Sequence, residues 1–144
     1  MSFLGLDVGK KRIGMAIGSV IAEEFSTLTI KDPAKSFLDG KIGTNQAAQR
    51  LREIVESNRI EKIIIGNPIN QDDSDTQMSR DIQLFSQKLM SSLDIPIEMT
   101  NESLTSYAAE EMLKEEGLSI KETKLRVDQT AAKLILQQYI EDHP

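Results

Sequence analysis

Phe3-Leu-Gly-Leu-Asp-Val-Gly9 is a short apolar run, and after Lys10-Lys11-Arg12 a second one follows, Ile13-Gly-Met-Ala-Ile-Gly-Ser19. Short apolar runs bounded by glycine and basic residues are typical of buried strands, so the two runs predict a β-hairpin. Asp7 lies inside the first predicted strand, where an unmatched carboxylate costs several kcal/mol. We therefore expect a cation, hydrogen bonds or a proton at Asp7; the alternative is an Asp that caps the hairpin turn.

The composition indicates one soluble globular domain over residues 1–144. The chain is 39% apolar and 28% charged, and it has no apolar run long enough to span a membrane and no leader pattern. The absence of cysteine argues against disulfides and thiolate metal sites and fits a cytoplasmic protein. His143, the single histidine, lies in the tail, which argues against zinc or histidine chemistry. Carboxylates remain as the plentiful catalytic groups.

The later chain alternates strand and helix patterns. Three β-prone runs come first, the third over residues 26–30, and are followed by a loop over 31–43. The predicted elements after it are a helix from Thr44, a strand over 62–66, a helix through residues 78–89, a strand over 95–100, a helix from about 105 to 117, and a last helix over 128–141. This order predicts an α/β fold with a three-strand antiparallel meander and later strands parallel to the first.

Polar groups follow the ends of three predicted strands. Asp7 is near the end of the first, residues 67–72 (Asn-Pro-Ile-Asn-Gln-Asp) follow the strand over 62–66, and Glu102 follows the strand over 95–100. Because sites in open α/β sheets form at the carboxyl ends of parallel strands, we expect these groups to meet at one edge.

Asp128 is a fourth candidate for the same site. In a helix it shares a face with Ala131, Ala132 and Ile135, so packing of that face on the sheet would turn Asp128 inward. The alternative is that Asp128 caps the start of the helix. Converging carboxylates repel unless a cation joins them, and all-oxygen ligands suit Mg²⁺ or Mn²⁺. Such a site predicts metal-dependent hydrolysis of phosphodiesters.

Four motifs in order resemble the YqgF/RuvX family: residues 4–9 (Leu-Gly-Leu-Asp-Val-Gly), 64–70 (Ile-Ile-Gly-Asn-Pro-Ile-Asn), 101–105 (Asn-Glu-Ser-Leu-Thr) and 127–139 (from Val to Tyr). The resemblance covers essentially the whole chain. It implies a single RNase H-like nuclease domain, with a mixed five-stranded sheet flanked by helices. It also implies that Asp7, Glu102 and Asp128 are the metal-binding catalytic acids, and that the protein is a Holliday junction resolvase or a nuclease for the 5′ end of pre-16S rRNA.

Two departures from the family pattern support a different class of function. The family usually has Asp-Glu-Arg where this chain has Asn101-Glu102-Ser103, and an Asp-Gly pair in the loop after Asn70 is missing. A non-catalytic RNA-binding factor in ribosome assembly is therefore the second hypothesis. A nucleotide-phosphate module is a third, disfavoured because actin-like ATPases need two such lobes.

The leading hypothesis is a Mg²⁺- or Mn²⁺-dependent endonuclease that acts on precursor rRNA or on branched DNA. The net charge of −6 argues against binding of nucleic acid through bulk charge, so contacts must be local. We expect these contacts at Lys10, Lys11, Arg12 and Asn70. The protein is expected to be cytoplasmic, away from membranes, and a monomer or a homodimer.

Overall fold

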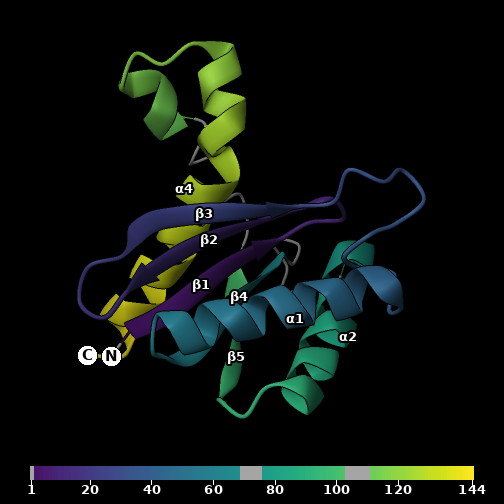
Figure 1. The fold of residues 1–144 in the computed structure, drawn as a ribbon. Helices are drawn as coiled ribbons and strands as arrows, with labels where there is room; N and C mark the ends of the chain where they lie inside the picture. Colours follow the sequence, from purple (N-terminus) through teal and green to yellow (C-terminus); the bar gives the residue numbers. More distant parts are fainter. Residues whose placement is uncertain (1, 69–75, 103–110) are drawn as a thin grey trace.

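A computed structural model describes residues 2–68, 76–102 and 111–144 of the chain, with only the backbone described for Glu102 and for residues 120–125. The elements are β1 (Ser2–Val8), β2 (Arg12–Gly18), β3 (Glu23–Thr29), α1 (Ile42–Ser57), β4 (Ile60–Pro68), α2 (Gln77–Ser92), β5 (Ile97–Glu102) and α4 (Ile120–Asp142) (Figure 1).

The strands form one mixed sheet in the order β3-β2-β1-β4-β5. β1, β2 and β3 are an antiparallel meander, whereas β4 pairs parallel to β1 and β5 pairs parallel to β4. The expected five-stranded α/β sheet is thus confirmed. The carboxyl ends of β1, β4 and β5 lie at one edge, as parallel pairing requires.

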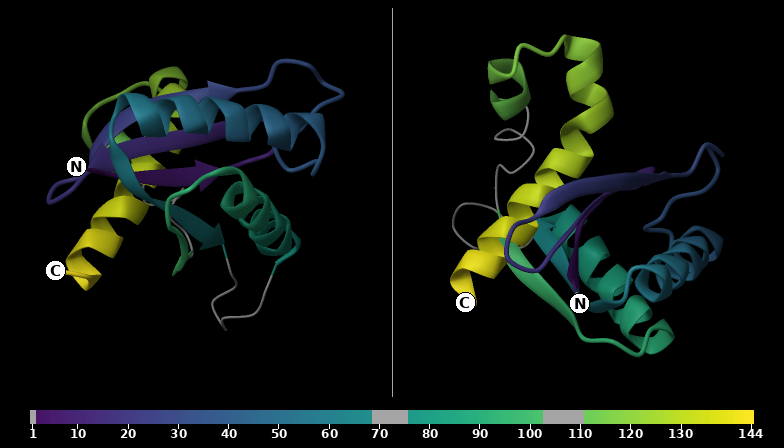
Figure 2. Two further views of the ribbon diagram at one scale, coloured as in Figure 1. Left: turned by 60° about the horizontal axis from the view of Figure 1, so that its bottom comes forward. Right: turned by 60° about the vertical axis from the view of Figure 1, so that its left-hand side comes forward.

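Helices cover both faces of the sheet (Figures 1 and 2). α1 and α2 pack on one face and α4 crosses the other. The apolar run of β4 serves both layers: Ile63 and Ile65 belong to the core under α1 and α2, and Ile64 belongs to the core under α4. This explains why the run is continuous rather than alternating.

Two glycines let α4 lie directly on the hairpin of β1 and β2. A Cβ at Gly5 would come within 2.7 Å of the Leu136 Cβ, and a Cβ at Gly14 would collide with the backbone carbonyl of Asp128. Both positions therefore require a residue without a side chain. The close approach fixes where the side chains of α4 stand above the sheet.

A loop over residues 30–41 connects the meander to α1 and is held by the turn between β1 and β2. The Ile30 amide donates to the Lys11 carbonyl at 2.9 Å, and the Phe37 amide donates to the Lys10 carbonyl at 2.7 Å. The Lys11 ammonium donates to the carbonyls of Asp32 and Pro33 at 2.9 and 3.2 Å, and to that of Lys35.

The last helix differs from its prediction. It begins at Ile120 rather than at residue 128, so Asp128 is in its interior and the alternative of an N-cap is wrong. Residues 103–110, where the preceding helix was expected to start, lie outside the described residues, and residues 111–115 are helical. Within the described residues, every helix is too short or too polar to cross a membrane.

Candidate metal and nucleic-acid site

Asp7 and Asp128 come together at the carboxyl end of β1. Asp7 pairs across the antiparallel ladder with Gly14, and Asp128 of α4 lies directly over Gly14, its Cβ 2.7 Å from where a Gly14 Cβ would be. Both carboxylates are partly buried. The missing side chain at Gly14 therefore creates the space in which two acids far apart in sequence become neighbours.

The surroundings of Asp7 favour its protonated form. Burial, and then the nearby Asp128 carboxylate, raise the pKa of Asp7 from 3.8 to about 7, and the Arg12 guanidinium opposes the rise. Asp7 therefore keeps its proton to a higher pH than an exposed aspartate does. A cation between the two carboxylates would offset the contribution of Asp128 to this shift.

Arg12 already supplies part of that positive charge. Its Nε lies 2.6 Å from Oδ2 of Asp128, and the two side chains are 57% and 20% exposed. Arg12 was expected to contact nucleic acid, and its ion pair with Asp128 was not expected. A local sequence pattern cannot indicate this ion pair, because Arg12 is in the first hairpin and Asp128 is in the last described helix.

Glu102 is the final residue of β5, and its backbone pairs in register with Pro68 at the end of β4. It therefore lies at the same edge of the sheet as the end of β1. Asn70, the other polar group expected there, is outside the described residues.

The donor chemistry at this edge fits a hard divalent ion. Two carboxylates converge, and the side chains that the structure describes contain no group of three or more possible His, Cys, Asp or Glu ligands. The third acid that the family resemblance implies is Glu102, for which the backbone alone is described. Carboxylate oxygens are the donors that Mg²⁺ and Mn²⁺ prefer.

Asn101 lies on the opposite face of the sheet from Asp7 and Asp128. Asn67 continues the alternation of Ile63 and Ile65, which face α1 and α2, and its Nδ2 donates to Oδ1 of Asn101 at 3.2 Å. Asn67 is only 7% exposed. The departure from the family pattern at position 101 therefore falls outside the pair of carboxylates.

The three basic residues of the β1–β2 turn have different surroundings. Lys11 is engaged by the carbonyls of the loop over 30–41, and Arg12 by Asp128. Lys10 is exposed, and within the described residues its side chain has no ion pair. Of the three basic residues in the turn, Lys10 is therefore the one whose ammonium group has no ion-pair partner among the described residues.

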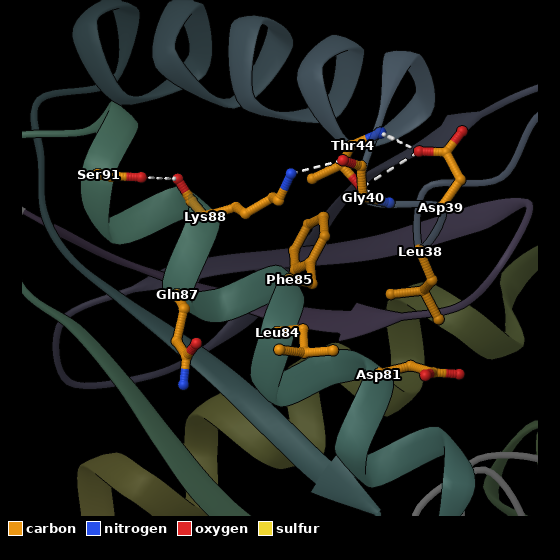
Figure 3. A pocket seen from close by; sticks show the side chains of 10 residues that line it. All are labelled: Leu38, Asp39, Gly40, Thr44, Asp81, Leu84, Phe85, Gln87, Lys88 and Ser91. Atoms are coloured by element: carbon orange, nitrogen blue, oxygen red, sulfur yellow. Dashed lines mark hydrogen bonds between the residues drawn. The ribbon is translucent and has the colours of Figure 1, made fainter.

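A separate cavity of about 300 Å³ lies between the start of α1 and α2, on the face away from the carboxylates (Figure 3). Its wall combines Leu38, Leu84 and Phe85 with polar groups, of which Thr44 and Lys88 are already hydrogen-bonded. Asp39 accepts from the Thr44 amide at 3.2 Å and caps α1. The cavity offers no acidic cluster, so we place the candidate site at the end of β1.

Sequence comparison gives one family for the whole chain. The family described as "RuvX: Holliday junction resolvase" matches residues 1–142. A relative from Thermosynechococcus vestitus, named as a candidate pre-16S rRNA nuclease, is 37% identical over 141 residues, which cover 98% of this chain and 88% of the relative. A relative of the same name from Maridesulfovibrio salexigens is 33% identical over 140 residues, covering 97% of this chain and 98% of the relative.

Structural comparison gives a consistent result. The chain resembles Thermus thermophilus RuvC in complex with a Holliday junction substrate, with a TM-score of 0.63 and 14% sequence identity over 99% of this chain and 95% of that chain. A second structure of the same RuvC gives a TM-score of 0.52, at 13% identity and the same coverage of both chains. At such low identity the likeness concerns the fold, and it confirms the expected RNase H-like architecture.

Proposed function

The chain belongs to the RuvX family, and from this premise we propose that it is a divalent-metal-dependent endonuclease whose catalytic acids are Asp7, Glu102 and Asp128. The observation that carries the proposal is the meeting of Asp7 and Asp128 across Gly14. Burial and the nearby Asp128 carboxylate raise the pKa of Asp7, and a cation beside such a carboxylate would stabilise its ionised form.

Mg²⁺ or Mn²⁺ is the proposed ion, held by the carboxylates of Asp7, Glu102 and Asp128. The backbone position of Glu102 supports its inclusion: Glu98 of the same strand contacts Tyr139 of α4, and the two-residue period of a strand assigns position 102 to the same face. When bound, the ion supplies Lewis acidity toward the scissile phosphate and water. The protein fixes the acids at one sheet edge, and Asp7 must release its proton for the ion to bind.

The proposed substrate is precursor 16S rRNA, cut near its 5′ end in the cytoplasm. The names of the relatives support this choice. Branched DNA is the second candidate, supported by the description of the family. The second hypothesis, a non-catalytic RNA-binding factor, was based in part on Asn101 in place of the family's Asp. Asn101 lies on the other face of the sheet, so this difference does not affect Asp7 or Asp128. Lys10 and Asn70 are the proposed phosphate contacts near the site, and the protein acts as a monomer or a homodimer.

Replacement of the acids tests the proposal. Asp7→Asn and Asp128→Asn each remove a metal ligand and are expected to lower the cleavage rate by at least about a hundredfold, since loss of a carboxylate ligand removes charge that holds the ion. End-labelled precursor 16S rRNA and a four-way DNA junction are incubated in parallel with Mg²⁺, Mn²⁺ or EDTA. The substrate that is cut identifies the activity.

Asp94→Asn is the matched control, because it removes one carboxylate from an exposed position away from the sheet edge. It should cleave at the wild-type rate. Cleavage that persists in EDTA, or wild-type rates in both Asp7→Asn and Asp128→Asn, would overturn the assignment. Thermal unfolding of each variant checks that the fold is retained.

A further inference from the structure

We infer that the groove between β3 and α1 binds a single-stranded segment of the nucleic-acid substrate, with the phosphate backbone on Lys31 and Arg50 and a base on Phe25. The groove consists of two hollows of about 480 and 310 Å³ that share Arg50 and Glu53 in their walls. This inference rests on the proposed function, because it takes the substrate to be nucleic acid, and it concerns a surface on the other face of the sheet from the carboxylates.

The larger hollow is lined by more basic than acidic side chains, although the chain as a whole has a net charge of −6. Three basic side chains line it against two acidic ones: Lys31, Lys35 and Arg50 against Asp32 and Glu53. Lys35 and Asp32 are paired at 3.9 Å, whereas Lys31 and Arg50 are exposed and have no ion pair within the described residues. Two exposed cations without partners are the groups that a phosphate backbone neutralises most readily.

Phe25 gives the smaller hollow an exposed aromatic ring. The ladder between β2 and β3 pairs Met15 with Ser26 and Ala16 with Glu24, so Phe25 is the extra residue of a β-bulge. A bulge at a sheet edge redirects a side chain, and Phe25 is 38% exposed in the wall of the hollow. A cationic groove with an aromatic platform is the arrangement that binds single strands, because every base can stack on a ring.

The groove is joined to the candidate site by the turn between β1 and β2. Phe37, which lines the larger hollow, is bonded through its amide to the carbonyl of Lys10, and Ile30 is bonded to the carbonyl of Lys11. The same turn begins two residues after Asp7. The loop also explains why Lys11 is absent from the proposed contacts: its ammonium holds the wall of the groove.

Binding without cleavage tests the groove separately from the active site. Fluorescence anisotropy in EDTA measures the Kd of a labelled single-stranded oligouridylate and of a blunt RNA duplex as salt is varied. Lys31→Gln/Arg50→Gln should raise the Kd for the single strand about tenfold and reduce the slope of log Kd against log salt by about 1 to 2. Phe25→Ala should raise the Kd about tenfold without changing that slope. Duplex binding should change less in both variants.

The controls carry the same change of charge or apolar surface elsewhere. Arg59→Gln/Lys114→Gln removes two exposed cations, and Leu84→Ala removes an exposed apolar side chain. Both should bind like the wild type. If Lys31→Gln/Arg50→Gln and Phe25→Ala match these controls, or the wild type binds no single strand at low salt, the groove is not the binding surface. Cleavage that still depends on Asp7 and Asp128 would then leave the nuclease assignment standing.

Discussion

Asp7 is the residue whose protonation most directly couples the candidate site to the stability of the fold. Its pKa is raised from 3.8 to about 7 by burial and by Asp128, against the opposing effect of Arg12. The folded protein therefore binds the Asp7 proton more tightly than the unfolded chain does. The stabilisation that results is complete below pH 3.8 and is lost as the pH rises through about 7.

The first prediction follows from this difference in proton affinity. Between pH 4 and pH 8 the metal-free wild type should lose up to about 4 kcal/mol of unfolding free energy relative to Asp7→Asn, whose amide does not titrate. Urea unfolding of both proteins at a series of pH values measures the difference. If the difference in unfolding free energy between the wild type and Asp7→Asn stays constant with pH, the pKa of Asp7 is not raised.

Arg12 and a divalent ion compete for the same carboxylate. The guanidinium lies 2.6 Å from Asp128, so an ion that binds Asp128 must displace or tolerate it. Arg12→Gln should therefore tighten Mn²⁺ binding roughly fivefold, a modest effect because the side chain is largely exposed and screened. Calorimetric titration at pH 8.5, above the raised pKa of Asp7 in the wild type, measures the dissociation constant.

Lys10→Gln is the matched control for Arg12, since it removes one cation from the same turn without touching Asp128. Its Mn²⁺ affinity should stay close to that of the wild type. Equal affinities for the two variants, or weaker binding by Arg12→Gln, would mean that the ion pair does not compete with the metal.

At the scale of elements, α4 positions the site because it is fixed to the sheet at several points along its length. Arg126 binds Glu24 through two hydrogen bonds of 3.2 and 2.9 Å, and Gln129 donates to Thr27 at 3.0 Å. Toward its other end, Tyr139 donates to Glu98 and accepts from a lysine on β4. The helix thus cannot slide without breaking contacts at both ends.

Gly14→Ala tests how tightly the position of α4 controls the acids. The added Cβ collides with the Asp128 backbone, so the helix must shift. We expect a loss of about 1–3 kcal/mol in unfolding free energy from overpacking. The cleavage rate at a temperature where the variant is folded should fall more than tenfold, because the two carboxylates separate.

Gly117→Ala is the comparison for that variant. Gly117 has a φ of 80° and no atom within 4 Å of an added Cβ, so the substitution strains the backbone locally without moving α4. It should lose a similar amount of stability and keep its cleavage rate. If both variants lose activity in proportion to stability alone, α4 does not set the geometry of the site.

Much of the element layout could be predicted from local patterns. The apolar run before Gly66 predicted a strand covered on both faces, and β4 is that strand. A clear pattern of apolar residues indicates directly which side chains are buried, so strands and helices with such a pattern can be predicted from the sequence. β3 was predicted over 26–30 but spans Glu23–Thr29, because its first two residues are charged and lie at the edge of the sheet.

The pairings within the site could not be predicted in the same way. The approach of Asp7 to Asp128 was expected from strand ends and from the small-residue face of the last helix, and both acids do meet. The ion pair of Arg12 with Asp128, the use of Lys11 to hold a loop and the bulge at Phe25 were all missed. Each depends on contacts between segments distant in sequence, for which a local pattern carries no signal.

At the scale of the whole molecule, contacts with nucleic acid must be local. The net charge of −6 opposes the approach of a polyanion, whereas Lys31 and Arg50 beside the larger hollow are exposed and have no ion pair within the described residues. Binding through such a local pair of cations favours one orientation of the substrate.

The placement of one acid on the first strand and another on the last described helix has a consequence for biosynthesis. A ribosome releases β1 early and α4 late, so Asp128 can reach Asp7 only after nearly the whole of residues 1–142 has been made. With Asp128 as a catalytic acid, as proposed above, the emerging polypeptide would stay unable to cut nucleic acid until α4 docks. The order of synthesis would then keep the proposed activity off beside the rRNA of the ribosome that is making the chain.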